Sequence, residues 1–169
     1  TCQQVAKAVK NASLGTTENL SSKLYECIPL HPVTALMLGP ISRRRFGQNE
    51  RSIFSFLTSG EPNSLNHFLR NELSTSKKIF TVDLLWDYLK INLEPLILSS
   101  PDGHLWSEAT EALIRAEKKG NNNHLKIVKA VAIIEIFGKQ FGIRPSKEIL
   151  ESLLDEDTNI KSILKDLES

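Results

Sequence analysis

Residues 125–137, LKIVKAVAIIEIF, decide the fold class of this chain. Lys126, Lys129 and Glu135 are the only charged residues of the stretch, and the other ten are apolar. We predict a helix here, and because it is apolar on almost every side, it must be buried nearly all round. Helical patterns occur on both sides of it, so the predicted fold class is all-α.

Four segments before this stretch show apolar residues at helical spacing. They are residues 1–13, a short segment at 65–69, residues 82–93 and residues 104–118. Pro95 is expected to end or bend the third of these helices. The large aromatic residues of the last two segments fit core packing better than an exposed stacking surface; they are Trp86, Tyr88 and Trp106.

Two further helices are predicted after the apolar stretch. Residues 142–145 form an extended connector, Ser146 caps one helix, and Asp157 or Thr158 caps the last one. A helix, a connector and two more helices make the outline of a winged-helix domain that lacks its wing. The missing β-hairpin would follow Ser169.

The residues Gly-Asn-Asn-Asn at 120–123 are the clearest linker pattern in the chain. We therefore predict a helical bundle over residues 1–120 and a three-helix, winged-helix-like region over residues 121–169.

Composition limits the kind of protein. The hydrophobic content of 40% and the charged content of 24% are ordinary for a soluble globular protein. We expect no membrane span and no signal peptide. The two cysteines are too few for a disulfide framework, which favours a cytoplasmic location. Cys27 and His31 have metal-ligand spacing, but no second pair follows, so no metal site is expected.

A second stretch, YECIPLHPVTALMLGPISRRRFGQNERSIFSFL at residues 25–57, places apolar and cationic blocks side by side. Pro32 is expected to open a short apolar helix over residues 33–38, which Gly39 and Pro40 bend or interrupt. A second helix is expected from about Asn49. We interpret this stretch as the functional site.

The charge of the chain is unevenly distributed. Residues 1–60 contain seven basic and three acidic residues, whereas residues 61–169 contain fourteen and seventeen. The basic excess is too small and too local for a nucleic-acid surface. We therefore predict an anion pocket instead. The acidic residues near the C-terminal end argue further against DNA binding.

The segments PLHPVTALML and RRRFGQNERSIFSFL resemble a region of large bacterial P-loop ATPases of the AAA+/STAND kind, which are often encoded near mobile or defence genes. LLWDYLKINLEPLI, LWSEATEALIRAE, LKIVKAVAIIEIFG and RPSKEILESLL follow in the same order, so the resemblance covers about residues 20–155. The phosphate-binding motif G-x-x-x-x-G-K-S/T is absent. We expect a piece of a longer protein, without its own ATPase activity, and the missing initiator Met agrees.

The resemblance implies that residues 1–120 are lid-like and that Arg51 reaches a nucleotide phosphate, with Gln48 and Arg45 as further candidates. A planar guanidinium suits phosphate because it bonds two oxygens at once. The alternative is a surface arginine that pairs with Glu50 or Glu72.

The resemblance also implies that residues 29–32, PLHP, lie against the nucleotide. Pro29 or Pro32 would pack on the adenine, and His31 would contact a phosphate or sense its loss. The alternative, a loop proline beside a partly buried histidine, is favoured by the residues themselves.

We therefore expect a non-catalytic region that closes over a nucleotide and couples its state to downstream domains. The implied partner is the nucleotide-binding domain of the parent chain, with ATP or ADP and Mg bound there and no cofactor in this region. Two alternatives stay open, a stand-alone protein-interaction module and a nucleic-acid-binding module that uses Arg43, Arg44 and Arg45.

Overall fold

The computed structural model describes residues 1–12, 19–44, 52–72, 78–119, 121–155 and 158–168. The predicted all-α class is confirmed, because helices make up almost all of the regular structure in these ranges. Within them, no helix is both long enough and apolar enough to cross a membrane. The α-helices are α1 (Cys2–Ala12), α2 (Leu20–Glu26), α3 (Pro32–Ser42), α4 (Ser52–Thr58), α5 (Leu65–Glu72), α6 (Val82–Leu98), α7 (Gly103–Lys119), α8 (Asn122–Ile133), α9 (Lys147–Glu151) and α10 (Ile160–Glu168).

The apolar stretch that decides the fold class forms α8 and the turns that follow it. Asn121 caps α8 through a capping box with His124, so the helix begins inside the predicted linker. The chain then winds into a π-helical turn, η1 (Ile134–Gly138), and a short 3₁₀ turn, η2 (Lys139–Phe141). Glu135 is the only exposed residue between positions 125 and 138, which confirms the predicted burial.

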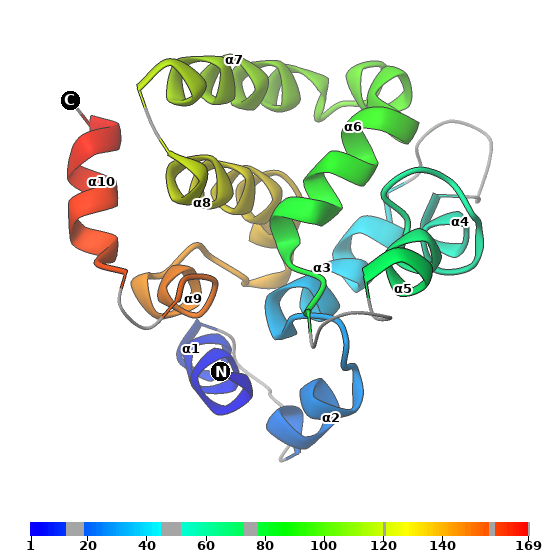
Figure 1. Cartoon of the computed structure of the whole chain (residues 1–169), viewed down its shortest axis with the longest axis horizontal. Helices are drawn as coiled ribbons and strands as arrows, with labels where there is room; N and C mark the ends of the chain where they lie inside the picture. Colours follow the sequence, from blue (N-terminus) through cyan, green and yellow to red (C-terminus); the bar gives the residue numbers. More distant parts are fainter. Residues whose placement is uncertain (13–18, 45–51, 73–77, 120, 156–157, 169) are drawn as a thin grey trace.

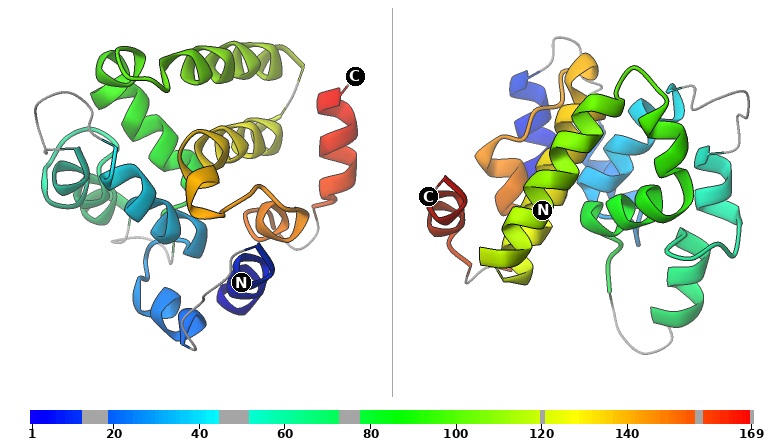
Figure 2. Two further views of the ribbon diagram at one scale, coloured as in Figure 1. Left: turned by 180° about the vertical axis from the view of Figure 1, so that it is seen from behind. Right: turned by 90° about the horizontal axis from the view of Figure 1, so that it is seen from above.

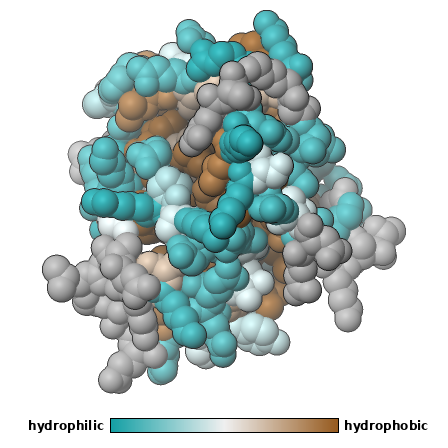
Figure 3. Space-filling view, turned by 90° about the vertical axis from the view of Figure 1, so that its left-hand side faces the viewer, coloured by the Kyte–Doolittle hydropathy of each residue, from teal (hydrophilic) through white to brown (hydrophobic). Residues whose placement is uncertain are grey.

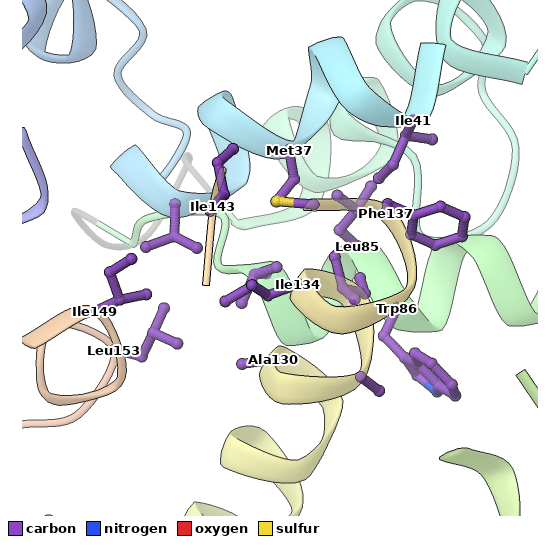
Figure 4. Packing of buried hydrophobic residues seen from close by; sticks show 14 of the residues in the cluster. Met37, Ile41, Leu85, Trp86, Ala130, Ile134, Phe137, Ile143, Ile149 and Leu153 are labelled. Carbon is purple, nitrogen blue, oxygen red and sulfur yellow. The ribbon is translucent and has the colours of Figure 1, made fainter. Parts of the chain in front are cut away.

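Other helices surround α8 and η1 on several sides. In Figure 1, α7 lies above α8 and α6 crosses beside it, and the views in Figure 2 show the same arrangement. Met37 of α3 points toward η1, where Ile134 and Phe137 are fully buried (Figure 4). The central helix is therefore buried because helices from both halves of the chain pack on it.

The first helix packs against the ninth, although they lie far apart in the sequence (Figure 1). The side chain of Gln4 donates a hydrogen bond to the carbonyl of Glu148 at 3.1 Å. Val5 and Val9 are buried and belong to the same apolar cluster as Ile149. The two regions that we predicted to meet at residue 120 thus share one core.

Two tryptophans form the bulkiest part of this core. The rings of Trp86 on α6 and Trp106 on α7 stack with centroids 4.0 Å apart and planes 13° apart. Neither ring is accessible to solvent, and the indole N–H of Trp106 donates to Glu94 at 2.9 Å. The prediction that these aromatic residues pack in the core is confirmed.

Two prolines were expected to bend or end a helix, and neither of them ends it. Helix α3 continues through Pro40 to Ser42, and α6 continues through Pro95 to Leu98. A proline inside a helix removes one backbone hydrogen bond. At Pro95 the carbonyl that loses its partner belongs to Ile91, a residue that is 59% exposed and so lies on the solvent side of α6.

The C-terminal elements follow the predicted order. Ser146 caps α9 by accepting from the N–H of Ile149 at 3.4 Å, as expected. The side chain of Asn159, and not that of Thr158, accepts from the N–H of Lys161 at the start of α10. Asp157 lies outside the described residues, and the likeness to a winged-helix domain stays a prediction.

The tight turn between α6 and α7 requires a glycine. A Cβ atom at Gly103 would overlap the carbonyl oxygen of Leu98, which belongs to the backbone at the end of α6. We expect Gly103→Ala to lower the free energy of unfolding by about 1–3 kcal/mol, the usual cost of overpacking. Chemical denaturation measures this change.

Gly60 provides the matched control for this prediction. It follows α4 with no positive φ, and a Cβ atom there would meet no heavy atom within 4 Å other than those of its chain neighbours. Because alanine at a compatible position reduces the conformational freedom of the unfolded chain relative to glycine, we expect Gly60→Ala to be neutral or stabilising. Equal losses of stability in the two variants would contradict the assignment of the close approach to Gly103.

Candidate functional site

The PLHP segment, residues 29–32, is attached to the chain just before α6. The carbonyl of Pro29, which follows a cis peptide bond, accepts from the N–H of Phe80 at 2.8 Å. The N–H of His31 donates to the carbonyl of Phe80 at 2.9 Å. These two bonds form a parallel bridge between Leu30 and Phe80, which holds the segment in an extended conformation ahead of α3.

His31 connects this segment to the C-terminal part of the molecule. Its side chain is only 4% exposed, Nδ1 accepts from the N–H of Val33, and Nε2 lies 2.9 Å from the carbonyl of Ser152. Since a backbone N–H donates to Nδ1 and a carbonyl needs a donor, the proton is on Nε2 and the ring is neutral. Both ring nitrogens are therefore engaged, and a phosphate contact by His31 would require one of these bonds to break.

Burial is the main reason why the pKa of His31 falls from 6.5 to about 4. The hydrogen bond to Ser152 opposes this change, and the positive charge of Lys126 adds to it. The histidine is thus a neutral structural link near neutral pH.

The PLHP segment forms one wall of an open groove, which we call the PLHP groove. Its volume is about 790 Å³, within the range of small-molecule sites. Residues 78–84, α5, the first turns of α8 and the chain after α9 form the other walls. His31 and Pro32 line it, whereas Pro29 lies between two residues that do. The main apolar residues of the lining are Leu30, Pro32, Phe68, Phe80, Leu84 and Leu153.

Charged residues also line the PLHP groove. Asp87 is held by Lys129, whose Nζ lies 2.7 and 2.9 Å from the two carboxylate oxygens. Lys126, one turn earlier on α8, is half-buried and forms no ion pair with a described residue. Lys78 and Asp155 complete the charged lining.

Arg43 and Arg44, which follow α3, make contacts within the fold. The guanidinium of Arg43 lies 5.0 Å from the ring centroid of Phe141, a cation–π contact. Arg44 forms an ion pair with Asp102 at 3.2 Å and donates to the carbonyl of Ile136 at 3.2 Å. The two neighbours thus face different partners, as the angle between adjacent helical residues predicts.

Neither Arg43 nor Arg44 is among the described residues that line the PLHP groove. The other predicted nucleotide contacts, Arg45, Gln48 and Arg51, lie outside the described residues. Their roles stay predictions.

A second groove runs between α7, α8 and α10, and we call it the α7–α8–α10 groove. Its volume is about 470 Å³. Figure 3, which faces this side of the molecule, shows apolar surface in a hollow between hydrophilic residues. The lining includes Leu105, Ala109, Val128, Val131, Leu164 and Leu167, with Glu108 and Glu135 as acidic members.

Sequence reasoning missed Lys126 and Phe80 as site residues. The available signal for Lys126 was its place in an otherwise apolar helix, because a charge in such a helix needs a partner or an opening to solvent. No local sequence pattern indicates Phe80 as a site residue, since its bridge to Leu30 joins residues that are fifty positions apart.

Among the described residues, no three side chains of His, Cys, Asp or Glu come together in a way that could hold a metal ion. Comparisons of the chain with protein-family models, with curated proteins and with solved structures found no match.

Proposed function

We propose that the chain is a non-catalytic helical region of a larger ATPase, which closes over a nucleotide held by another domain and transmits its state. The observation that carries this proposal is the position of the PLHP segment. The resemblance assigns these residues to nucleotide contact, and His31 and Pro32 lie on the wall of an open groove of ligand size.

The contacts of His31 support the second half of the proposal, the transmission of a signal. His31 joins the PLHP segment to Ser152, and the next residue, Leu153, forms part of the opposite wall of the groove. A ligand that moves one wall therefore acts on the other through a buried hydrogen bond. This connection between the walls responds to a ligand only if the ligand binds two arrangements of the walls with different affinities.

Hydrolysis and Mg binding belong to the parent domain in this proposal. The chain has no phosphate-binding loop, whose backbone N–H groups and lysine hold the phosphates in P-loop enzymes. What this region contributes is an apolar wall, which suits a base, and a positive charge beside it.

The purified chain is expected to show no ATPase activity and no tight nucleotide binding. A lid alone offers a few contacts, so the dissociation constant for ADP should lie at about 1 mM or above. Phosphate release and isothermal titration calorimetry test the two statements. Turnover that survives removal of contaminating ATPases, or micromolar binding of ADP, would contradict them.

The proposal itself is tested on the parent gene and the parent protein. A P-loop motif within roughly 300 codons upstream, the length of one or two domains, is expected. If it is there, Pro32→Ala in the parent should weaken nucleotide binding while the fold persists. The absence of a P-loop from the parent protein would contradict the proposed function.

A second candidate, a protein-interaction module, is favoured by the α7–α8–α10 groove, because contiguous apolar surface marks interaction sites. Nucleic-acid binding has less support, since Arg43 and Arg44 are already engaged with Phe141 and Asp102.

A further inference from the structure

Lys126 is an unusual residue within α8. It occupies the first half of this helix, where it is half-buried and lines the PLHP groove. Lys129, one turn later, has a carboxylate partner in Asp87 at 2.7 Å. Among the residues that the structure describes, Asp87 pairs with Lys129 and no carboxylate pairs with Lys126, so the two lysines of this helix differ in their counter-ions.

A half-buried ammonium without a counter-ion is unfavourable, because it loses part of its hydration without gaining an opposite charge. Asp155 lines the same groove but forms no ion pair with Lys126. The charge of Lys126 also reaches His31 across the groove wall, where it helps to lower the pKa of that ring. The positive charge is thus directed into the groove.

The other cationic candidates of the groove are less suitable. His67 shares a hydrogen bond with Asn71 at 3.0 Å. Lys78 already takes part in an interaction within the chain. Asp87 does not offset Lys126, since Lys129 neutralises it through two short hydrogen bonds. Thr1 also lines the groove with its α-ammonium group, so Lys126 is the remaining side-chain cation that an incoming anion would meet beside that terminal charge.

We propose that Lys126 is the anion-receiving residue of the PLHP groove and takes a phosphate of an adenine nucleotide whose base lies on Ile28 and Ile79. The inference rests on the proposed function, and it names a phosphate contact that the resemblance did not imply. Ile28 and Ile79 line the groove and are 52% and 46% exposed, so the wall offers an accessible apolar face for an aromatic ring. The groove volume of about 790 Å³ admits a nucleotide.

The test is an NMR titration of the ¹⁵N-labelled full chain with three separate probes, ADP, adenosine and pyrophosphate. ADP should shift the amides of groove residues, adenosine those beside Ile28 and Ile79, and pyrophosphate those beside Lys126. In Lys126→Met the affinity for ADP should fall at least about tenfold, the loss of one charge-assisted bond. Pyrophosphate shifts should disappear, and adenosine shifts should persist.

Two control variants accompany the test. Lys126→Arg keeps the charge and should retain the pyrophosphate shifts, which separates charge from folding. Lys161→Met removes an exposed lysine of α10 outside the PLHP groove and should leave all three titrations unchanged. A loss of binding in Lys161→Met equal to that in Lys126→Met would overturn the inference.

The remaining outcomes separate the inference from the proposed function. Groove shifts with ADP that are the same in Lys126→Met would overturn the inference and leave the proposed function standing. Pyrophosphate shifts that require Lys126, without any adenosine shifts, would support the anion site and overturn the nucleotide role, in favour of an acidic peptide. No groove shifts with any probe would overturn both.

Discussion

Lowering the pH from 7 to 4 is expected to remove roughly 3 kcal/mol of stability through one side chain, His31. Its pKa is about 4 in the folded chain and 6.5 ordinarily, mainly because the ring is buried. Between pH 6.5 and about pH 4 the unfolded chain binds a proton that the folded chain does not. The free energy of unfolding therefore decreases as the pH is lowered through this range. The stability that the neutral His31 ring contributes is fully present above pH 6.5 and is lost below about pH 4.

Carboxylates titrate in part of the same range, so the measurement needs a variant that lacks the imidazole. Asparagine at this position keeps an acceptor for the N–H of Val33 but has no titrating group. Urea denaturation at several pH values should show His31→Asn to be less stable at pH 7, with the difference narrowing by about 3 kcal/mol at pH 4. Parallel pH profiles for the two proteins would show that His31 is not the titrating group.

Trp86→Ala is expected to lower the free energy of unfolding by about 3–5 kcal/mol, the usual cost of deleting a buried aromatic side chain. The ring is fully buried and stacked on Trp106 with 4.0 Å between centroids, so a cavity and a lost stacking contact both contribute. Since a typical domain is stable by about 5–15 kcal/mol, this change removes a large part of the total.

Ile91→Ala is the control on the same helix, because Ile91 is 59% exposed. Its cost should lie within about 0.5 kcal/mol, as for most surface substitutions. Chemical denaturation compares the two variants directly. A similar cost for both would mean that the Trp86–Trp106 stack does not hold α6 on α7.

The all-α class and the burial of residues 125–137 could be predicted because they depend on local spacing of apolar residues. The continuation of α3 and α6 through prolines could not, since packing outweighed the lost hydrogen bond. The extra turn of α3 buries Ile41 and brings Arg44 to Asp102, and the extra turn of α6 buries Ile97. These gains depend on partners far away in the sequence.

Only a part of the candidate site could be predicted, because some of its contacts join residues that lie far apart in the sequence. The PLHP segment could be identified from its prolines and its resemblance, and it does line a groove. The bond from His31 to Ser152 joins residues 121 positions apart, and no local pattern indicates such a pair. In the same way, no local pattern indicates that Arg44 ties α3 to the α6–α7 turn and to η1.

The packing of α1 on α9 has a consequence for the order of synthesis. A ribosome makes α1, which carries Val5, well before α9, which carries Ile149 of the same apolar cluster and emerges roughly 140 residues later. At 5–20 residues per second this delay is on the order of ten seconds. During that time α2 and α3 can already pack on α1, but the part of α1 that contacts α9 stays uncovered. That part of the apolar surface is therefore open to other molecules until α9 leaves the exit tunnel.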